Sequence, residues 1–103
     1  MTQFKFNEDN ILNDLKRYIE GTYSAHYVGK NNVQSLDLIF SSGHGEGFCI
    51  GSILKYSARF GRKRGKNKDD LLKAAHYAIL SLYLLEEEEK EEMLKKSPRK
   101  NEE

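Results

Sequence analysis

Four cationic side chains fall at positions where two successive helices would bring them together. Lys55 and Arg59 are four residues apart, so on a helix they share one face, one turn from each other. Lys73 follows in the next predicted helix, and Lys63 lies in the segment between the two. If these helices pack antiparallel, the four cations gather at one end of the pair. Lysine and arginine donate charge-assisted hydrogen bonds to anionic oxygens, so this pattern predicts a phosphate site, with ordinary surface charge as the alternative.

The segment between those helices is strongly basic. Five positive charges fall within seven residues, at Arg62, Lys63, Arg64, Lys66 and Lys68. A Walker-type phosphate loop is excluded, because only three residues separate Gly61 from Gly65 and Asn67 stands where a serine or threonine is needed. A strand should also precede such a loop, whereas a helix is predicted here. We interpret the segment as a solvated loop, with contact to nucleic acid phosphates as the alternative.

The histidines, the cysteine and the glutamate run do not form a metal-binding pattern. Zinc sites usually contain pairs of ligands two to five residues apart, and only His44 and Cys49 approach that spacing. Cys49 is interpreted instead as a small core residue. A lone cysteine cannot form an intrachain disulfide, which favours a reducing compartment. The glutamates between Glu86 and Glu92 leave no apolar side, so they predict a solvated helix.

Length and composition restrict the class of protein. A chain of 103 residues is enough for one domain with a modest core. Hydrophobic residues make up 38% and charged residues 32%, and the formal net charge of +1 gives no argument from overall basicity. No apolar run approaches the roughly 18 residues of a membrane span, and the N-terminus lacks a secretory pattern. We expect a small, soluble, intracellular, mainly α protein, a bundle of three to four helices with a long C-terminal helix.

Helical periodicity predicts two elements in the first part of the chain. A helix is expected from about Asn7 to Glu20, capped by Asn7 or Asp9 and stopped by Gly21. A loop over residues 22–32 follows it. Residues 33–40 form a short helix capped by Asn31 or Asn32, and three glycines predict a loop over residues 41–47.

Two longer helices complete the prediction. One runs from Phe48 to Phe60, and Gly51 within it suggests the close approach of another backbone or of a ligand. The other opens at Asn67 or Asp69 and ends at Pro98. It is expected to continue through the glutamates with the ion pairs Glu86–Lys90 and Glu91–Lys95.

Several of these pieces, taken in order, resemble a family of small bacteriophage proteins. The shared positions are His26-Tyr27, Leu36-Asp37, Gly47-Phe48-Cys49-Ile50-Gly51, Lys55-Tyr56, Arg59, Gly61, Lys63, Gly65, Asp70-Leu71-Leu72-Lys73-Ala74 and Tyr77. The resemblance covers roughly residues 25–82. The family includes the nucleotide kinase of a short-tailed coliphage, which phosphorylates deoxynucleoside monophosphates without a Walker loop, and domains of unknown function. It implies a phage origin, the cytoplasm of the infected bacterial host and a role around nucleotides.

The resemblance also suggests a division of the chain. Residues 1–24 form an N-terminal helix, residues 25–85 the helical domain similar to the phage nucleotide kinase, and residues 86–103 a charged helical extension and tail. The basic segment and the acidic tail look like additions peculiar to this chain.

The leading hypothesis is a nucleotide-binding phage protein and, in its stronger form, a deoxynucleoside monophosphate kinase. Its phosphate-binding residues would be Lys55, Arg59, Lys63 and Lys73. Its base-binding or orienting residues would be His26, Tyr27, Tyr56 and Tyr77, although the last two also suit a core. Phosphoryl transfer would need Mg2+, with Asp37 as the protein ligand unless Asp37 merely pairs with a nearby cation.

The second hypothesis is a non-catalytic host-takeover protein. It would bind a bacterial protein or nucleic acid through Arg62, Lys63, Arg64, Lys66 and Lys68, together with the acidic tail. Under either hypothesis we expect a homo-oligomer, because a thin helical bundle leaves apolar surface that a second copy can cover. We also expect no contact with a membrane.

Overall fold

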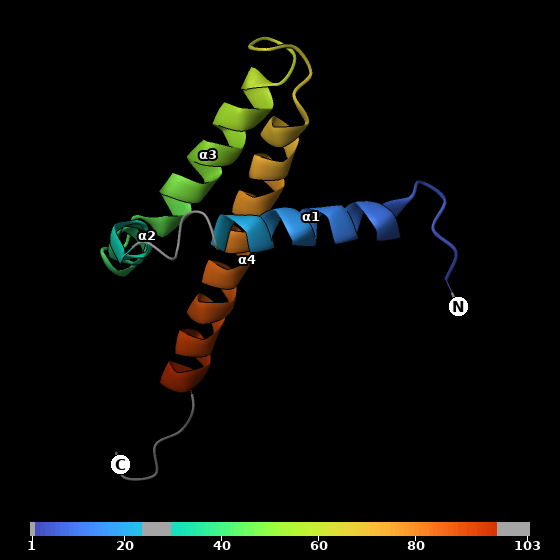
Figure 1. Cartoon of the computed structure of the whole chain (residues 1–103). Coiled ribbons are helices and arrows are strands. Elements are labelled where there is room, and N and C mark those ends of the chain that lie inside the picture. Colours follow the sequence, from blue (N-terminus) through green and yellow to red (C-terminus); the bar gives the residue numbers. More distant parts are fainter. Residues whose placement is uncertain (1, 24–29, 97–103) are drawn as a thin grey trace, which may run out of the picture.

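The computed structural model describes residues 2–23 and 30–96; for residues 30–34 it describes the backbone only. All regular structure in these ranges is helical (Figure 1). In chain order the elements are α1 (Glu8–Thr22), α2 (Lys30–Ser41), α3 (Gly45–Arg59) and α4 (Lys68–Lys96). The mainly α prediction, with a long C-terminal helix, is therefore confirmed.

The helices α3 and α4 form an antiparallel pair at the centre of the molecule, joined by the basic loop at one end (Figure 1). α1 crosses α4 at a steep angle and α2 packs against α3. Cys49 on α3 is the one apolar side chain that is fully buried among the described residues, which confirms its predicted place in the core. Burial raises the pKa of its thiol, and a side-chain hydrogen bond with Ser81 opposes that shift. The core is thin, as a chain of this length allows.

The turn between α2 and α3 is shorter than predicted. The sequence predicts a loop over residues 41–47, but α2 extends to Ser41 and α3 begins at Gly45. Gly43 makes the turn with a φ of 89°, a left-handed conformation that glycine adopts without strain. A Cβ atom on Gly45 would lie only 2.8 Å from Leu84 Cδ1 and 2.9 Å from Phe40 Cδ1. Gly45 therefore allows α2, α3 and α4 to meet closely.

Gly51 does not have the role that the sequence suggests for it. A Cβ atom there would meet no other atom within 4 Å, and the residue is exposed. The prediction of a close approach at Gly51 is thus wrong, because the helix turns this position toward solvent. The close approach occurs at Gly45, six residues earlier on the same helix.

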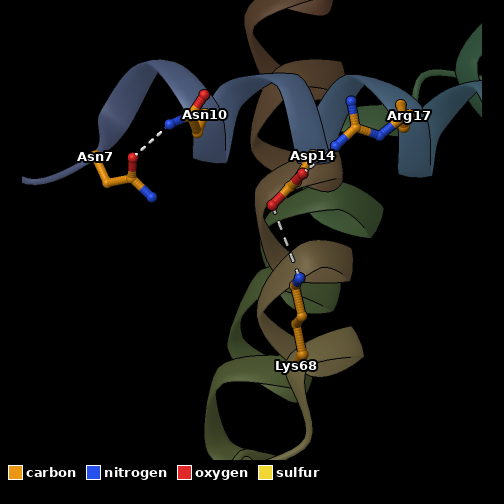
Figure 2. A network of polar contacts seen from close by, with 5 residues as sticks. All are labelled: Asn7, Asn10, Asp14, Arg17 and Lys68. Carbon is orange, nitrogen blue, oxygen red and sulfur yellow. Dashed lines mark hydrogen bonds and ion pairs between the residues drawn. The ribbon is translucent and has the colours of Figure 1, made fainter.

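The predicted ends of α1 and α2 need correction. α1 passes through Gly21 and ends at Thr22, so Gly21 does not stop it. Asn7 is the N-cap, with a φ of 63°, but its Oδ1 accepts a hydrogen bond from Asn10 Nδ2 at 2.7 Å and does not cap the backbone (Figure 2). α2 already begins at Lys30, so neither Asn31 nor Asn32 precedes it and the predicted loop is too long.

The last helix continues through the glutamates to Lys96, as predicted. Its ion pairs differ from the predicted ones: Lys90 Nζ lies 3.2 Å from Glu87 Oε2, and Lys96 Nζ lies 4.0 Å from Glu92 Oε1. At the other end, Lys68 Nζ lies 3.9 Å from Asp14 Oδ2 and links α4 to α1 (Figure 2). No helix within the described ranges is long and apolar enough to cross a membrane.

Candidate anion-binding site

Three cations converge on the ring of Tyr56. Lys55 Nζ lies 5.3 Å from the ring centroid, Arg59 Cζ 5.2 Å and Lys73 Nζ 5.9 Å. Each distance falls within the roughly 6 Å range of a cation–π interaction. The helical repeat sets Lys55 and Arg59 one turn apart on α3, and the antiparallel packing of α4 adds Lys73 from across the interface.

A buried carboxylate holds Arg59 in place. Arg59 Nε donates a hydrogen bond to Asp70 Oδ1 at 3.1 Å, and Asp70, in the first turn of α4, has no exposed surface. The second oxygen, Asp70 Oδ2, is buried without a hydrogen-bond partner among the described residues. A guanidinium carries five N–H donors, and this bond uses only the one on Nε. Since 31% of the Arg59 side chain is exposed, its outer N–H groups can reach an anion from solvent.

The connecting loop fixes the distance between Arg59 and Asp70. Arg59 O accepts hydrogen bonds from the backbone N–H groups of Arg62, at 2.9 Å, and Lys63, at 3.2 Å. Gly61 N donates to Gly65 O at 2.9 Å, and the φ angles of Gly61 and Gly65 are 85° and 67°. This tight backbone returns the chain, so the last turn of α3 meets the first turn of α4.

The cluster of Lys55, Arg59, Lys73 and Asp70 has an excess of positive charge. Three cations and one carboxylate give these four side chains a net charge of +2. Neither lysine of the cluster forms an ion pair within residues 2–23 and 30–96. Such a preorganised group of cations favours a dianionic ligand such as a phosphate ester.

An aromatic cavity of about 330 Å³ adjoins the cluster. Side chains from all four helices line it, including Tyr18, Leu36, Ile39, Phe48, Lys73, His76 and Tyr77. Lys73 Nζ lies 6.0 Å from the Tyr18 centroid, so this amine stands between the rings of Tyr18 and Tyr56. The Tyr56 and Tyr77 rings stack with centroids 6.1 Å apart and planes at 7°, and Phe48 meets Tyr77 edge-on at 5.6 Å. The cation cluster and the cavity therefore share Lys73, and Tyr77 of the cavity stacks on Tyr56, the ring at the centre of the cluster.

Burial changes the titration of two groups that line the cavity. The pKa of His76 is lowered by desolvation, so this imidazole is neutral at pH 7. The pKa of Tyr18 is raised, chiefly by burial and then by Asp69 and Tyr56, so its phenol keeps its proton. The cavity thus offers neutral hydrogen-bonding groups and aromatic faces, whereas the charge lies at Lys73.

The structure leaves some of the predicted site residues outside this cluster. Lys63 is exposed in the loop, and within the described part of the chain it forms no ion pair or cation–π contact. Asp37 is exposed on α2, and Arg59 pairs with Asp70 instead of with Asp37. No group of three or more His, Cys, Asp or Glu side chains in the described ranges could hold a metal ion. His26 and Tyr27 lie outside the described residues.

The basic segment, Arg62, Lys63, Arg64, Lys66 and Lys68, is exposed along its whole length. Lys68 pairs with Asp14, and the other four form no ion pair with the residues that the structure describes. Arg64 has a φ of 63°, which is uncommon for a residue with a side chain.

Sequence reasoning missed four contributors to the site: Asp70, Tyr18, Phe48 and His76. The resemblance includes Asp70 and Phe48 without assigning them a role, and the sequence assigns no role to Tyr18 or His76. Asp70 and Arg59 are eleven positions apart, so no helical spacing connects them. The sequence does contain a signal for Tyr18: its hydroxyl group interrupts the otherwise aliphatic apolar face of the first helix.

Together, the fold and the cluster define a small α-helical protein with a cationic, aromatic-lined site between two antiparallel helices. A model of a family of proteins of unknown function, DUF3310, matches residues 22–79. Since this match spans more than half of the chain, the protein belongs to that family. Neither curated proteins nor solved structures give a significant match. The resemblance is therefore confirmed as far as a domain of unknown function, and its nucleotide kinase part stays a prediction.

Proposed function

We propose that this protein binds nucleotides through the cluster of Lys55, Arg59 and Lys73 around Tyr56. The observation that carries the proposal is the convergence of these three cations beside an aromatic cavity. The cluster suits a phosphate group and the cavity suits a planar base, and Lys73 borders both. A nucleotide combines these two chemistries in one molecule.

Each part of the ligand has identifiable partners. The outer guanidinium N–H groups of Arg59 can hold two phosphate oxygens at once, because Asp70 fixes the plane of the group through Nε. Lys55 and Lys73 supply further charge. In the cavity, the aromatic side chains of Tyr77 and Phe48 offer apolar surface to a base, and neutral His76 offers one donor and one acceptor. A volume of about 330 Å³ lies at the small end of ligand sites, which favours a mononucleotide.

Phosphoryl transfer is the stronger form of this proposal. It would need carboxylate side chains that hold Mg2+ beside the cluster, and few are available. Asp37 lies exposed on α2, Asp70 is committed to Arg59, and the described residues contain no group of three metal-binding side chains. The residues around the cluster thus do not fit a protein-held Mg2+, and we derive no transfer step. The phage origin and the host cytoplasm belong to the same proposal and are based on the resemblance alone.

A thermal-shift screen against nucleoside monophosphates, diphosphates and triphosphates tests the binding proposal. A ligand that binds only the folded protein adds about 2.7 kcal/mol of stability at a hundredfold excess over its Kd. We expect a shift with nucleotides and a much smaller one with the matching nucleosides. An absence of any shift across the panel would contradict the proposal.

Single substitutions then connect the binding to the cluster. Lys55→Gln, Arg59→Gln and Lys73→Gln should each weaken binding at least about tenfold, since a charge-assisted hydrogen bond contributes about 1.5–3 kcal/mol. Lys95→Gln, on the exposed end of α4, is the matched control and should leave the affinity unchanged. Equal affinities in all four variants would place the ligand elsewhere.

The second candidate is the host-takeover protein, and one observation favours it. Arg62, Lys63, Arg64 and Lys66 are exposed and form no ion pair within the described ranges. A host protein or nucleic acid would then be retained from bacterial lysate by the wild type and lost when these four residues become glutamine. Nucleotide binding should survive that change, because the loop contributes to the cluster through its backbone and not through these four side chains.

A further inference from the structure

An exposed apolar strip runs along one side of α4. Its large members are between 48% and 72% exposed: Leu71, Leu82, Leu85 and Met93. With 3.6 residues per turn they fall on one side of the helix, and the small residues Ala75 and Ala78 lie between them. Lys73 and Tyr77 face the opposite side, toward α3, so the strip is separate from the candidate anion-binding site.

Two oppositely charged segments lie near this strip, one before its first residue and one between Leu85 and Met93. The basic segment precedes α4, and the acidic segment, Glu86 to Glu92, occupies its far half (Figure 1). Within each segment most charges lack an ion pair in the described part of the chain; the exceptions are Lys68 with Asp14, Glu87 with Lys90 and Glu92 with Lys96. The segments cannot neutralise each other within one molecule, because the length of a continuous helix separates them (Figure 1).

Two leucines of the strip and the two charged segments are arranged symmetrically about nearly the same residue. Ala78 lies midway between Leu71 and Leu85, and it also lies midway between Arg64 and Glu92. A two-fold axis near Ala78 would therefore pair Leu71 with Leu85 of the partner subunit and set each basic segment against an acidic one. Small side chains at that point allow two helices to approach closely.

We propose that two copies of this chain associate through antiparallel α4 helices, with the apolar strip at the centre and the basic segment of each copy against the acidic segment of the other. A two-fold arrangement makes each charge contact twice. A parallel arrangement would bring like charges together, and the charge pattern opposes it. Twenty-nine residues give α4 a length of about 44 Å, which spans the strip and the acidic segment, and the basic segment lies directly before its first turn.

Reciprocal charge reversal tests this pairing. The first variant carries Arg62→Glu, Arg64→Glu and Lys66→Glu, and the second carries Glu88→Lys, Glu89→Lys and Glu91→Lys. By sedimentation velocity we expect the wild type to be dimeric, each variant alone to be monomeric, and an equimolar mixture of the two to form a dimer. Recovery in the mixture also shows that both variants are folded. Glu46→Lys, at the start of α3, is the matched control and should stay dimeric.

Several results would overturn the proposal. These are a wild-type protein that is monomeric at all concentrations, variants that dimerise alone, and a mixture that stays monomeric. Capture of a bacterial protein by a chain that is itself monomeric would also overturn it, in favour of a host partner on this face.

Cysteine cross-linking tests the direction of the helices. Leu71→Cys and Leu85→Cys proteins should form a disulfide-linked heterodimer when mixed and oxidised, because the two positions oppose each other only in the antiparallel arrangement. Each protein alone should cross-link poorly, and native Cys49 is fully buried and does not interfere. Efficient cross-linking of each variant with itself would indicate parallel helices and contradict the proposal.

Discussion

At the scale of single residues, Tyr56 and Asp70 organise the candidate site. The ring of Tyr56 gathers three cations, and the buried carboxylate of Asp70 sets the orientation of one of them. Cations held this close to one another repel, so the aromatic face and the carboxylate offset part of the cost of assembling them. An arriving anion would remove the rest of that repulsion, which is why the cluster favours phosphate.

Asp70→Asn tests the buried ion pair between Asp70 and Arg59. We expect it to lower the free energy of unfolding by about 1–3 kcal/mol, because Arg59 loses a charged acceptor. The chain has no tryptophan, so urea denaturation is followed by far-ultraviolet circular dichroism. Asp69→Asn, at the exposed neighbouring position, is the control and should change the stability by less than about 0.5 kcal/mol. Equal effects of the two substitutions would show that the ion pair does not stabilise the fold.

His76 should make stability depend on pH. Burial lowers the pKa of its imidazole in the folded protein, so at mildly acidic pH the unfolded chain binds more protons than the folded one. Stability should therefore fall as the pH drops below the ordinary histidine pKa of about 6.5, and level off only below the lowered folded pKa. His76→Gln should reduce this decline, and His44→Gln, at an exposed position, should not. Identical pH profiles for wild type and His76→Gln would contradict the assignment.

At the scale of elements, the helices could be predicted from local spacing, and their contacts could not. Periodicity gave four segments close to α1, α2, α3 and α4, because an apolar stripe is encoded in neighbouring residues. The role of Gly45 depends on Leu84 and Phe40, which lie on two other helices. For the same reason the pairing of Arg59 with Asp70 needs the loop geometry, whereas the shared face of Lys55 and Arg59 needs only the helical repeat.

The two glycines of α3 should respond oppositely to alanine. Gly51→Ala should raise the free energy of unfolding by about 0.5–1 kcal/mol, since the site is open and alanine favours the helix. Gly45→Ala should lower it by about 1–3 kcal/mol, because the new methyl group would press on Leu84 and Phe40. Urea denaturation measures both values. A stabilising Gly45→Ala would show that the junction of α2, α3 and α4 is looser than its distances indicate.

At the scale of the whole molecule, the two sides of α4 belong to two different surfaces. One side of the helix builds the cationic site with α3, and the opposite side carries the exposed apolar strip. The sequence predicts the charge segments and the need to cover apolar surface. The sequence alone does not show that the apolar strip and the cation cluster lie on opposite sides of α4, because this depends on where α3 packs.

If α4 pairs with a second copy, stability should depend on protein concentration. The thermal midpoint should rise with concentration, because association draws the equilibrium toward the folded dimer. Added salt should reduce the dependence, since it screens the contacts between the basic and acidic segments. Thermal unfolding followed by circular dichroism at several concentrations and salt levels measures both effects. A midpoint that is independent of concentration would indicate a monomer.

The most direct test of the central claim is a calorimetric comparison of a nucleoside monophosphate with its nucleoside. The comparison uses the wild type and the double variant Lys55→Gln/Lys73→Gln, with the nucleotide that gives the largest thermal shift. We expect the phosphate to tighten binding to the wild type at least about tenfold, which corresponds to about 1.4 kcal/mol, and to give little advantage in the double variant. If the double variant keeps the full phosphate advantage, the cations around Tyr56 do not bind the phosphate, which contradicts the proposed function.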